Sequence, residues 1–156
     1  MSHPHLVFKR VTTANEAEIL RVIRNECRTF MTRNTDEISA EQQQEWFKTA
    51  FKKYELYIAY AIEHGVCIVY AGYGLIHLNE GEYLLSGGLL PEYRDKGLGS
   101  QLFKFLVDNC NKQLPVRLEV LKTNIRALKT YEKLNFVTTG ENDKVYFMEY
   151  KYDSCI

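Results

Sequence analysis

The chain has 156 residues, of which 46% are apolar and 26% are charged, values typical of a globular protein. Its 20 Lys and Arg residues balance its 20 Asp and Glu residues, so no net basic charge indicates binding to nucleic acid or to an anionic membrane. The sequence shows neither a membrane-length apolar run nor the apolar core of a signal peptide. We therefore expect one domain over residues 1–156, located in the cytoplasm.

The first half of the chain predicts a strand, two helices and three further strands. Thr13 with Glu16, and Ser39 with Gln42, are capping-box pairs that mark the beginnings of the helices. Apolar residues recur at helical spacing after each pair, and the first such pattern continues through residue 31. The expected strands are residues 5–12, 55–62, 66–78 and 81–90, the last three consecutive and antiparallel because short glycine turns separate them.

The second half predicts a helix from Leu98, a strand over 115–123 and a short helix over 124–136. A turn and a last strand complete the chain within 140–152. The full order is β-α-α-β-β-β-α-β-α-β-β, which is typical of an α/β (α+β) domain. Such a domain has a mixed, mostly antiparallel sheet flanked by helices.

The cysteines do not have the spacing of a metal site. Cys27, Cys67, Cys110 and Cys155 are scattered, without a CxxC pair. We expect free thiols in a reducing compartment and no bound metal.

The stretch PEYRDKGLGS, residues 91–100, lies between a predicted strand and a predicted helix. A helix N-terminus carries unpaired N–H groups and a partial positive charge. Gly97 and Gly99 remove side chains where a phosphate would contact the backbone, and Arg94 adds a permanent positive charge. Neither GxxxxGK[ST] nor GxGxxG is present. The stretch therefore predicts a pyrophosphate site, with a tight turn that binds nothing as the alternative.

Three segments together indicate a family. PEYRDKGLG (91–99), LEV (118–120) and NIRALKTYEKLNF (124–136) resemble, in order and spacing, the motifs of the GNAT superfamily of acetyl-CoA-dependent N-acetyltransferases. The resemblance covers about residues 84–136. It implies direct transfer of an acetyl group from acetyl-CoA to a primary amine through a tetrahedral intermediate.

The resemblance also implies which residues bind the cofactor. In this family the glycine turn holds the pyrophosphate through backbone amides. The pantetheine arm lies where the preceding strand separates from the next, and it pairs with main-chain groups that correspond to those near Leu89 and Leu90. Asp95 departs from the family pattern, which often has Gly there, and it adds a negative charge near the phosphates. The cofactor-binding residues implied are Leu89, Leu90, Arg94, Asp95, Lys96, Gly97, Leu98, Gly99, Ser100, Asn124 and Lys133.

Tyr131 is the expected general acid. By the resemblance it lies near the sulfur of CoA, where a phenol could protonate the departing thiolate. The alternative is an ordinary core tyrosine.

Glu119 is the expected general base, because the LEV glutamate resembles the base position of ribosomal-protein alanine acetyltransferases. Alternation along the strand places it on the same face as Arg117. An ion pair with Arg117 is therefore an equally supported interpretation, and Glu82 and His77 are reserve candidates for the base.

The acceptor is the least defined element. In this fold it usually docks against the first two helices and their connection, here residues 28–39, whose charges are mixed. We expect a small-molecule or peptide amine acceptor and a monomer or homodimer. One alternative is an amino-sugar-nucleotide N-acetyltransferase, and another is a non-catalytic acyl-CoA-binding regulatory module.

Overall fold

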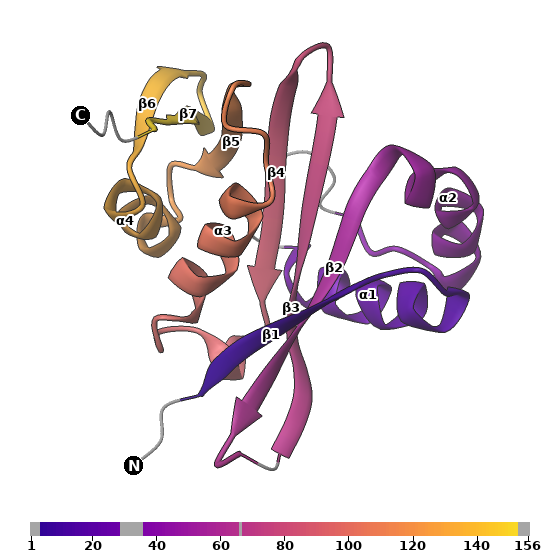
Figure 1. Cartoon of the computed structure of the whole chain (residues 1–156). Helices are drawn as coiled ribbons and strands as arrows, with labels where there is room; N and C mark the ends of the chain where they lie inside the picture. The colour runs from indigo at the N-terminus through magenta and orange to yellow at the C-terminus, as the bar shows by residue number, and fades with distance from the viewer. Residues whose placement is uncertain (1–3, 29–35, 66, 153–156) are drawn as a thin grey trace.

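A computed structural model describes residues 4–28, 36–65 and 67–152. It confirms the predicted order of elements (Figure 1). The elements are β1 (His5–Arg10), α1 (Ala14–Glu26), α2 (Ala40–Lys53), β2 (Tyr54–Glu63), β3 (Cys67–Asn79), β4 (Glu82–Leu89), the short 3₁₀ helix η2 (Pro91–Tyr93), α3 (Leu98–Asp108), β5 (Val116–Leu121), α4 (Ile125–Lys133), β6 (Phe136–Glu141) and β7 (Val145–Tyr150).

The strands form one mixed sheet in the order β1-β2-β3-β4-β5-β7-β6. All neighbouring strands are antiparallel except β4 and β5, which are parallel. Positive φ angles at His64 and Gly65, and again at Glu80 and Gly81, form the tight turns that join β2 to β3 and β3 to β4. Two successive residues of this conformation match the twist of an antiparallel hairpin.

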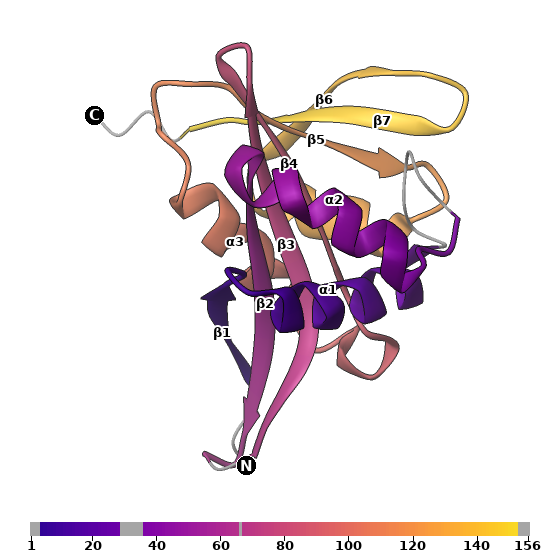
Figure 2. The same cartoon turned by 90° about the vertical axis from the view of Figure 1, so that its right-hand side faces the viewer.

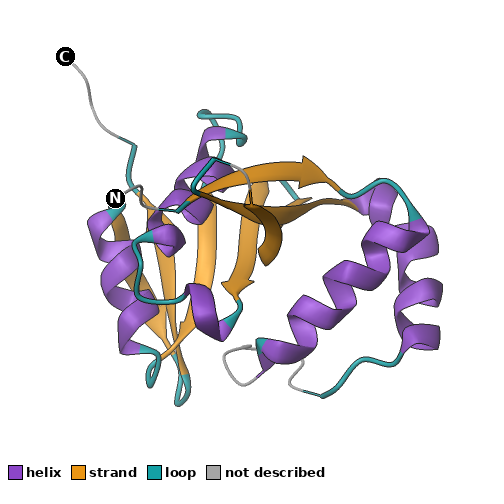
Figure 3. Ribbon diagram, turned by 90° about the horizontal axis from the view of Figure 1, so that it is seen from below, coloured by secondary structure: helices purple, strands orange, loops and turns teal. Residues whose placement is uncertain are grey.

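The helices lie on both faces of the sheet (Figures 1 and 3). α1 and α2 cover one face, where they pack on β2 and β3, while α3 packs on the opposite face and contacts α4 (Figure 2). Alternation along β2 explains the two layers, because Leu56 and Ile58 belong to the core beneath α1, and Tyr57 and Ala59 to the core beneath α3.

Both predicted capping boxes are confirmed, but α1 ends earlier than its apolar pattern predicts. The helix ends at Glu26, and Cys27 turns out of it to pack on β4. A Cβ at Gly88 would lie 2.9 Å from the Cys27 sulfur, so the two segments meet only because residue 88 is glycine. The prediction that the helix continues through residue 31 is therefore wrong at Cys27, and its remaining part lies outside the described residues.

The prediction of a helix over residues 124–136 is too long at its C-terminal end. α4 ends at Lys133, and Asn135 adopts a left-handed conformation with a φ of 74°. The backbone reverses there, so that Phe136 begins β6 instead of extending the helix.

Candidate active site

The glycine turn positions the N-terminus of α3. Gly97 is the N-cap, with a φ of 76°, and no side chain caps the helix. The other α-helices of the described residues are capped by Thr13, Ser39 and Asn124. A helix whose first-turn N–H groups lack a side-chain cap is suited to an anion.

Space around the two glycines is open. A Cβ at Gly97 would meet no atom within 4 Å, and one at Gly99 would meet only Thr130 Cγ2, at 3.7 Å. Packing against the protein therefore does not explain the missing side chain at Gly99, whereas the positive φ explains glycine at position 97.

Asp95 is paired across the turn. Its carboxylate lies 2.6 Å from Nε of Arg126 on α4, so the negative charge that the sequence adds to the turn is offset locally. Its φ of 64° explains why a glycine suits this position, since non-glycine residues rarely adopt that conformation. Arg126 was not among the residues predicted from the sequence.

β4 separates from β5 after a short contact. The two strands pair only at Tyr83 with Val116 and at Leu84 with Arg117. The Leu90 N–H bonds the Ala71 carbonyl on β3. Main-chain groups alternate in direction along a strand, so those of Leu89 point toward the side of β5.

Of the two residues expected to pair with pantetheine, Leu90 therefore directs its amide away from the opening, to β3. The Leu89 carbonyl accepts hydrogen bonds from Arg94 Nε, at 3.0 Å, and from the Cys27 thiol, at 3.4 Å. The Leu89 carbonyl, which points into the opening, is thus already hydrogen-bonded within the protein.

A cavity of about 300 Å³ passes through this opening. It is lined from both sides of the sheet, by residues of α1 and β3 on one side and of α3 and α4 on the other. The predicted site residues that it brings together are Leu89, Arg94, Gly99, Glu119, Asn124 and Tyr131.

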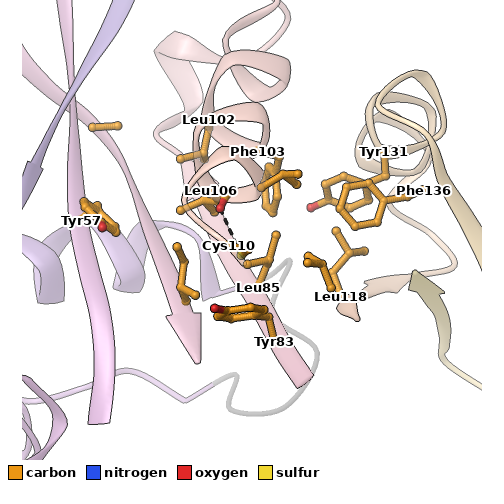
Figure 4. Close-up of a cluster of buried hydrophobic side chains, with 14 of the residues drawn as sticks. Tyr57, Tyr83, Leu85, Leu102, Phe103, Leu106, Cys110, Leu118, Tyr131 and Phe136 are labelled. Atoms are coloured by element: carbon orange, nitrogen blue, oxygen red, sulfur yellow. Dashed lines mark hydrogen bonds between the residues drawn. The ribbon is translucent and has the colours of Figure 1, made fainter. Parts of the chain in front are cut away.

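Tyr131 lies at the centre of an aromatic cluster and also lines the cavity. Its ring packs edge-to-face on Phe103 and Phe136, and Figure 4 shows its hydroxyl directed toward the side of Phe103. Burial raises the pKa of Tyr131, and the nearby Tyr73 raises it further. The hydroxyl therefore keeps its proton at neutral pH, as a general acid requires. The residue is both a core tyrosine and a wall of the cavity.

Glu119 is half-buried on β5 and also lines the cavity. Its neighbour Arg117 is engaged by other carboxylates, at 3.0 Å from Glu82 and 3.0 Å from Glu149. The reserve candidate Glu82 is therefore part of a surface ion pair. The other reserve, His77, packs edge-to-face on Tyr54.

Asn124 has a structural role beside its position in the cavity. Its side-chain oxygen accepts a hydrogen bond from the Ala127 amide at 3.3 Å and so begins α4. This bond fixes the start of the helix that carries Tyr131.

Several predicted residues lie outside the cavity wall. Leu98 is fully buried in the core, so only its main chain could contact a ligand. Lys96 is exposed above the ring of Tyr93, and Lys133 is exposed in the last turn of α4. Leu90, Asp95, Gly97 and Ser100 are likewise outside the lining. Most of the acceptor loop, residues 29–35, lies outside the described part of the chain.

The cavity also contains residues that the sequence analysis missed. Arg24 comes from α1, Cys27 from its C-cap, Tyr73 from β3 and Ser86 from β4. Arg24 had a recognisable signal, because it lies four residues after Leu20 and interrupts the apolar stripe of its helix.

Cys27 and Cys110 are buried free thiols. No three His, Cys, Asp or Glu side chains cluster as a metal site would need within residues 4–28, 36–65 and 67–152. In the same ranges, every helix is too short or too polar to cross a membrane.

Comparison with known proteins gives a consistent result. The family model described as the acetyltransferase (GNAT) family matches residues 19–136. No curated protein sequence matches the chain.

Among solved structures, spermidine N-acetyltransferase from Vibrio cholerae, in complex with CoA and spermine, superposes with a TM-score of 0.76 at 16% identity, covering 93% of this chain and 94% of the other. The Salmonella typhimurium protein yncA, solved with its cofactor acetyl-CoA, gives 0.71 at 16% identity, with 97% and 99% covered. AAC(6′)-Ib, in complex with ribostamycin and coenzyme A, gives 0.73 at 18% identity, with 96% and 93% covered. At these identities the similarity establishes the fold.

Proposed function

Since the chain belongs to the GNAT family of acetyltransferases, we propose that it transfers an acetyl group from acetyl-CoA directly to a primary amine. The observation that carries this proposal is the cavity between β4 and β5, which contains the uncapped end of α3, Tyr131 and Glu119 in its walls or at its rim. The cavity wall thus brings together Gly99 near the uncapped end of α3, a phenol and a carboxylate, which supports the proposal.

The residues fit the cofactor. The first-turn amides of α3 would hold the pyrophosphate, and Arg126 and Arg94 would add positive charge beside it. The main-chain groups of β4 that face the opening would pair with the pantetheine amides, as a neighbouring strand would. Bound acetyl-CoA supplies the thioester that the amine attacks.

The chain's own side chains would move the protons. Tyr131 would donate its proton to the departing thiolate, because its hydroxyl is protonated at neutral pH and its side chain lines the cavity. Glu119 would accept the proton of the attacking amine, directly or through water. These roles are supported by the shared cavity, since both side chains line it.

The proposal is tested by a panel of primary amines, incubated with the purified protein and acetyl-CoA while free thiol is measured. The panel contains amino acids, amino-acid amides, polyamines, aminoglycosides and N-terminal peptides. We expect amine-dependent thiol release for at least one class, with the acetylated product identified by mass. CoA binding without turnover of any member would instead support the non-catalytic module.

A further inference from the structure

Arg24 occupies an unusual position for a charged residue. It belongs to the stripe of α1 that faces the sheet, where Ala17 and Leu20 are buried, and it is followed by the buried C-cap residue Cys27. Charged side chains of a surface helix normally lie on its outer face. Arg21 of the same helix has protein partners, because it pairs with Glu18 and donates to the Ile38 carbonyl. The charge of Arg24 is instead directed into the protein, where it lines the cavity.

The surroundings of Arg24 do not neutralise it. Its Nε is buried and has no hydrogen-bond partner among the described residues. Its guanidinium lies 5.5 Å from the ring centre of Trp46. Through its charge and a hydrogen bond to Tyr73, it also offsets part of the rise that burial causes in the pKa of that tyrosine. An aromatic face and a phenol are favourable neighbours for a guanidinium, but neither supplies a negative charge.

The other arginines in the cavity wall have partners. Arg94 donates to the Leu89 carbonyl, and Arg126 pairs with Asp95. Glu119 is the one carboxylate among the described residues of the wall, and it lies on β5. Buried donors of a charged group are costly when they lack an acceptor, so the position of Arg24 favours an anionic ligand.

The location indicates which ligand this is. The glycine turn and α4 form the cavity on one side of the sheet, and α1 with Tyr73 forms it on the other. If the first side holds the cofactor, as proposed above, the α1 side is left for the acceptor. Arg24 then contacts the acceptor and not the phosphates of CoA.

We propose that Arg24 binds a carboxylate of the acceptor, so that the preferred substrates are small primary amines that carry a carboxylate, such as free amino acids. The planar fork of a guanidinium matches a carboxylate, and its charge disfavours polycationic amines. A cavity of about 300 Å³, which must also admit the thioester, favours a small acceptor. This inference rests on the proposed acetyltransferase function.

The first test uses the wild-type protein and pairs of acceptors that differ in one group. Each L-amino acid is compared with its amide and with its decarboxylated amine, and each kcat/KM is divided by the fraction of that amine that is deprotonated at the assay pH. We expect kcat/KM to be roughly 10- to 100-fold higher for the carboxylate form, the range that a charged hydrogen bond provides. Equal values across all pairs would overturn the proposal.

The second test assigns this preference to Arg24. In Arg24→Gln, kcat/KM for the carboxylate should fall roughly 10- to 100-fold while the value for the amide stays within about threefold. Arg24→Lys keeps the charge and loses the planar guanidinium, so its kcat/KM for the carboxylate should lie between those of the wild type and Arg24→Gln. Arg21→Gln removes the same charge from the same helix outside the cavity and should keep the full preference.

The outcomes separate this inference from the proposed function. If no amine turns over, the acetyltransferase proposal fails. If amines are acetylated without any preference for a carboxylate, or if Arg24→Gln lowers kcat/KM equally for amino acids and their amides, only the proposed role of Arg24 fails. CoA titration of each variant shows that the protein is folded, and weaker CoA binding in Arg24→Gln alone would move Arg24 to the cofactor site and contradict the proposal.

Discussion

Substituting Gly99 isolates the anion site from the stability of the fold. The residue lies in the first turn of α3, its φ is not left-handed, and its nearest neighbour would be Thr130 Cγ2, at 3.7 Å from a new Cβ. A methyl group therefore causes no clash with the protein. Because glycine is a poor helix former, alanine should stabilise α3 by about 0.5–1 kcal/mol, and valine should be no worse than glycine.

The effect on the cofactor should be the opposite. Alanine adds only one methyl group at this position, so Gly99→Ala should change CoA affinity by no more than about threefold. Compared with alanine, valine places two further methyl groups at the helix N-terminus, where a phosphate must approach the amides. Gly99→Val should weaken CoA binding at least tenfold, which corresponds to about 1.4 kcal/mol.

The assay is calorimetric titration with CoA, combined with denaturant unfolding of the same variants. Gly140→Val is a matched control, because a Cβ at Gly140 also has its nearest neighbour at 3.7 Å, the Phe147 ring, and Gly140 does not line the cavity. A folded Gly99→Val variant with wild-type CoA affinity would refute the assignment of this helix end as the pyrophosphate site.

Three further predictions concern titrating groups. Tyr131→Phe should lower kcat roughly 100-fold at unchanged CoA affinity. The wild-type kcat should not fall near pH 10, because burial holds the pKa of this tyrosine above its ordinary value. A normal kcat in the variant, measured where the chemical step limits the rate, would leave Tyr131 a core residue only. Glu119→Gln should lower kcat/KM most near neutral pH, and kcat/KM should recover at higher pH as solvent deprotonates the amine (pKa roughly 7.7–10.4). Parallel pH profiles for the wild type and the variant would exclude Glu119 as the base. Lys9 and the helix cap hold the pKa of Glu16 at about 2, below its ordinary value of 4.5, so its stabilisation is complete above about pH 4.5 and is lost as the pH falls toward 2. Glu16→Gln should therefore destabilise the protein at neutral pH but not near pH 2, which unfolding curves at several pH values would measure.

The sequence predicts the elements of this fold well because their signals are local. The capping boxes at Thr13 and Ser39 and the glycine turns between strands act over a few residues, and each is confirmed. The two misplaced helix ends have non-local or conformational causes. Cys27 leaves α1 because β4 offers it a glycine, and Asn135 ends the α4 region by adopting a left-handed backbone.

The candidate site shows the same division. The motif residues at the glycine turn, in β5 and in α4 are recognisable in the sequence, and six of the predicted residues share one cavity. The pairing of Asp95 with Arg126 cannot be predicted from the sequence, because it joins the glycine turn to the first turn of α4, which only the fold brings together. Arg24 was missed because a helical stripe predicts which face is buried and not what a charge on that face contacts.

The short contact between β4 and β5 has a mechanical consequence. Strands β1 to β4 form one unit and β5 to β7 another, and in the sheet they are joined through the pairs at Tyr83 and Leu84 alone. We expect this short junction to act as a hinge, because a small rotation of the three-stranded unit would change the cavity's width without breaking the ladders within either unit. A ligand that contacts the facing edges of both β4 and β5 would hold the two units at a fixed separation. Amide exchange in Leu85–Leu89 should then slow on CoA binding far more than exchange in the continuous ladder of β2 and β3.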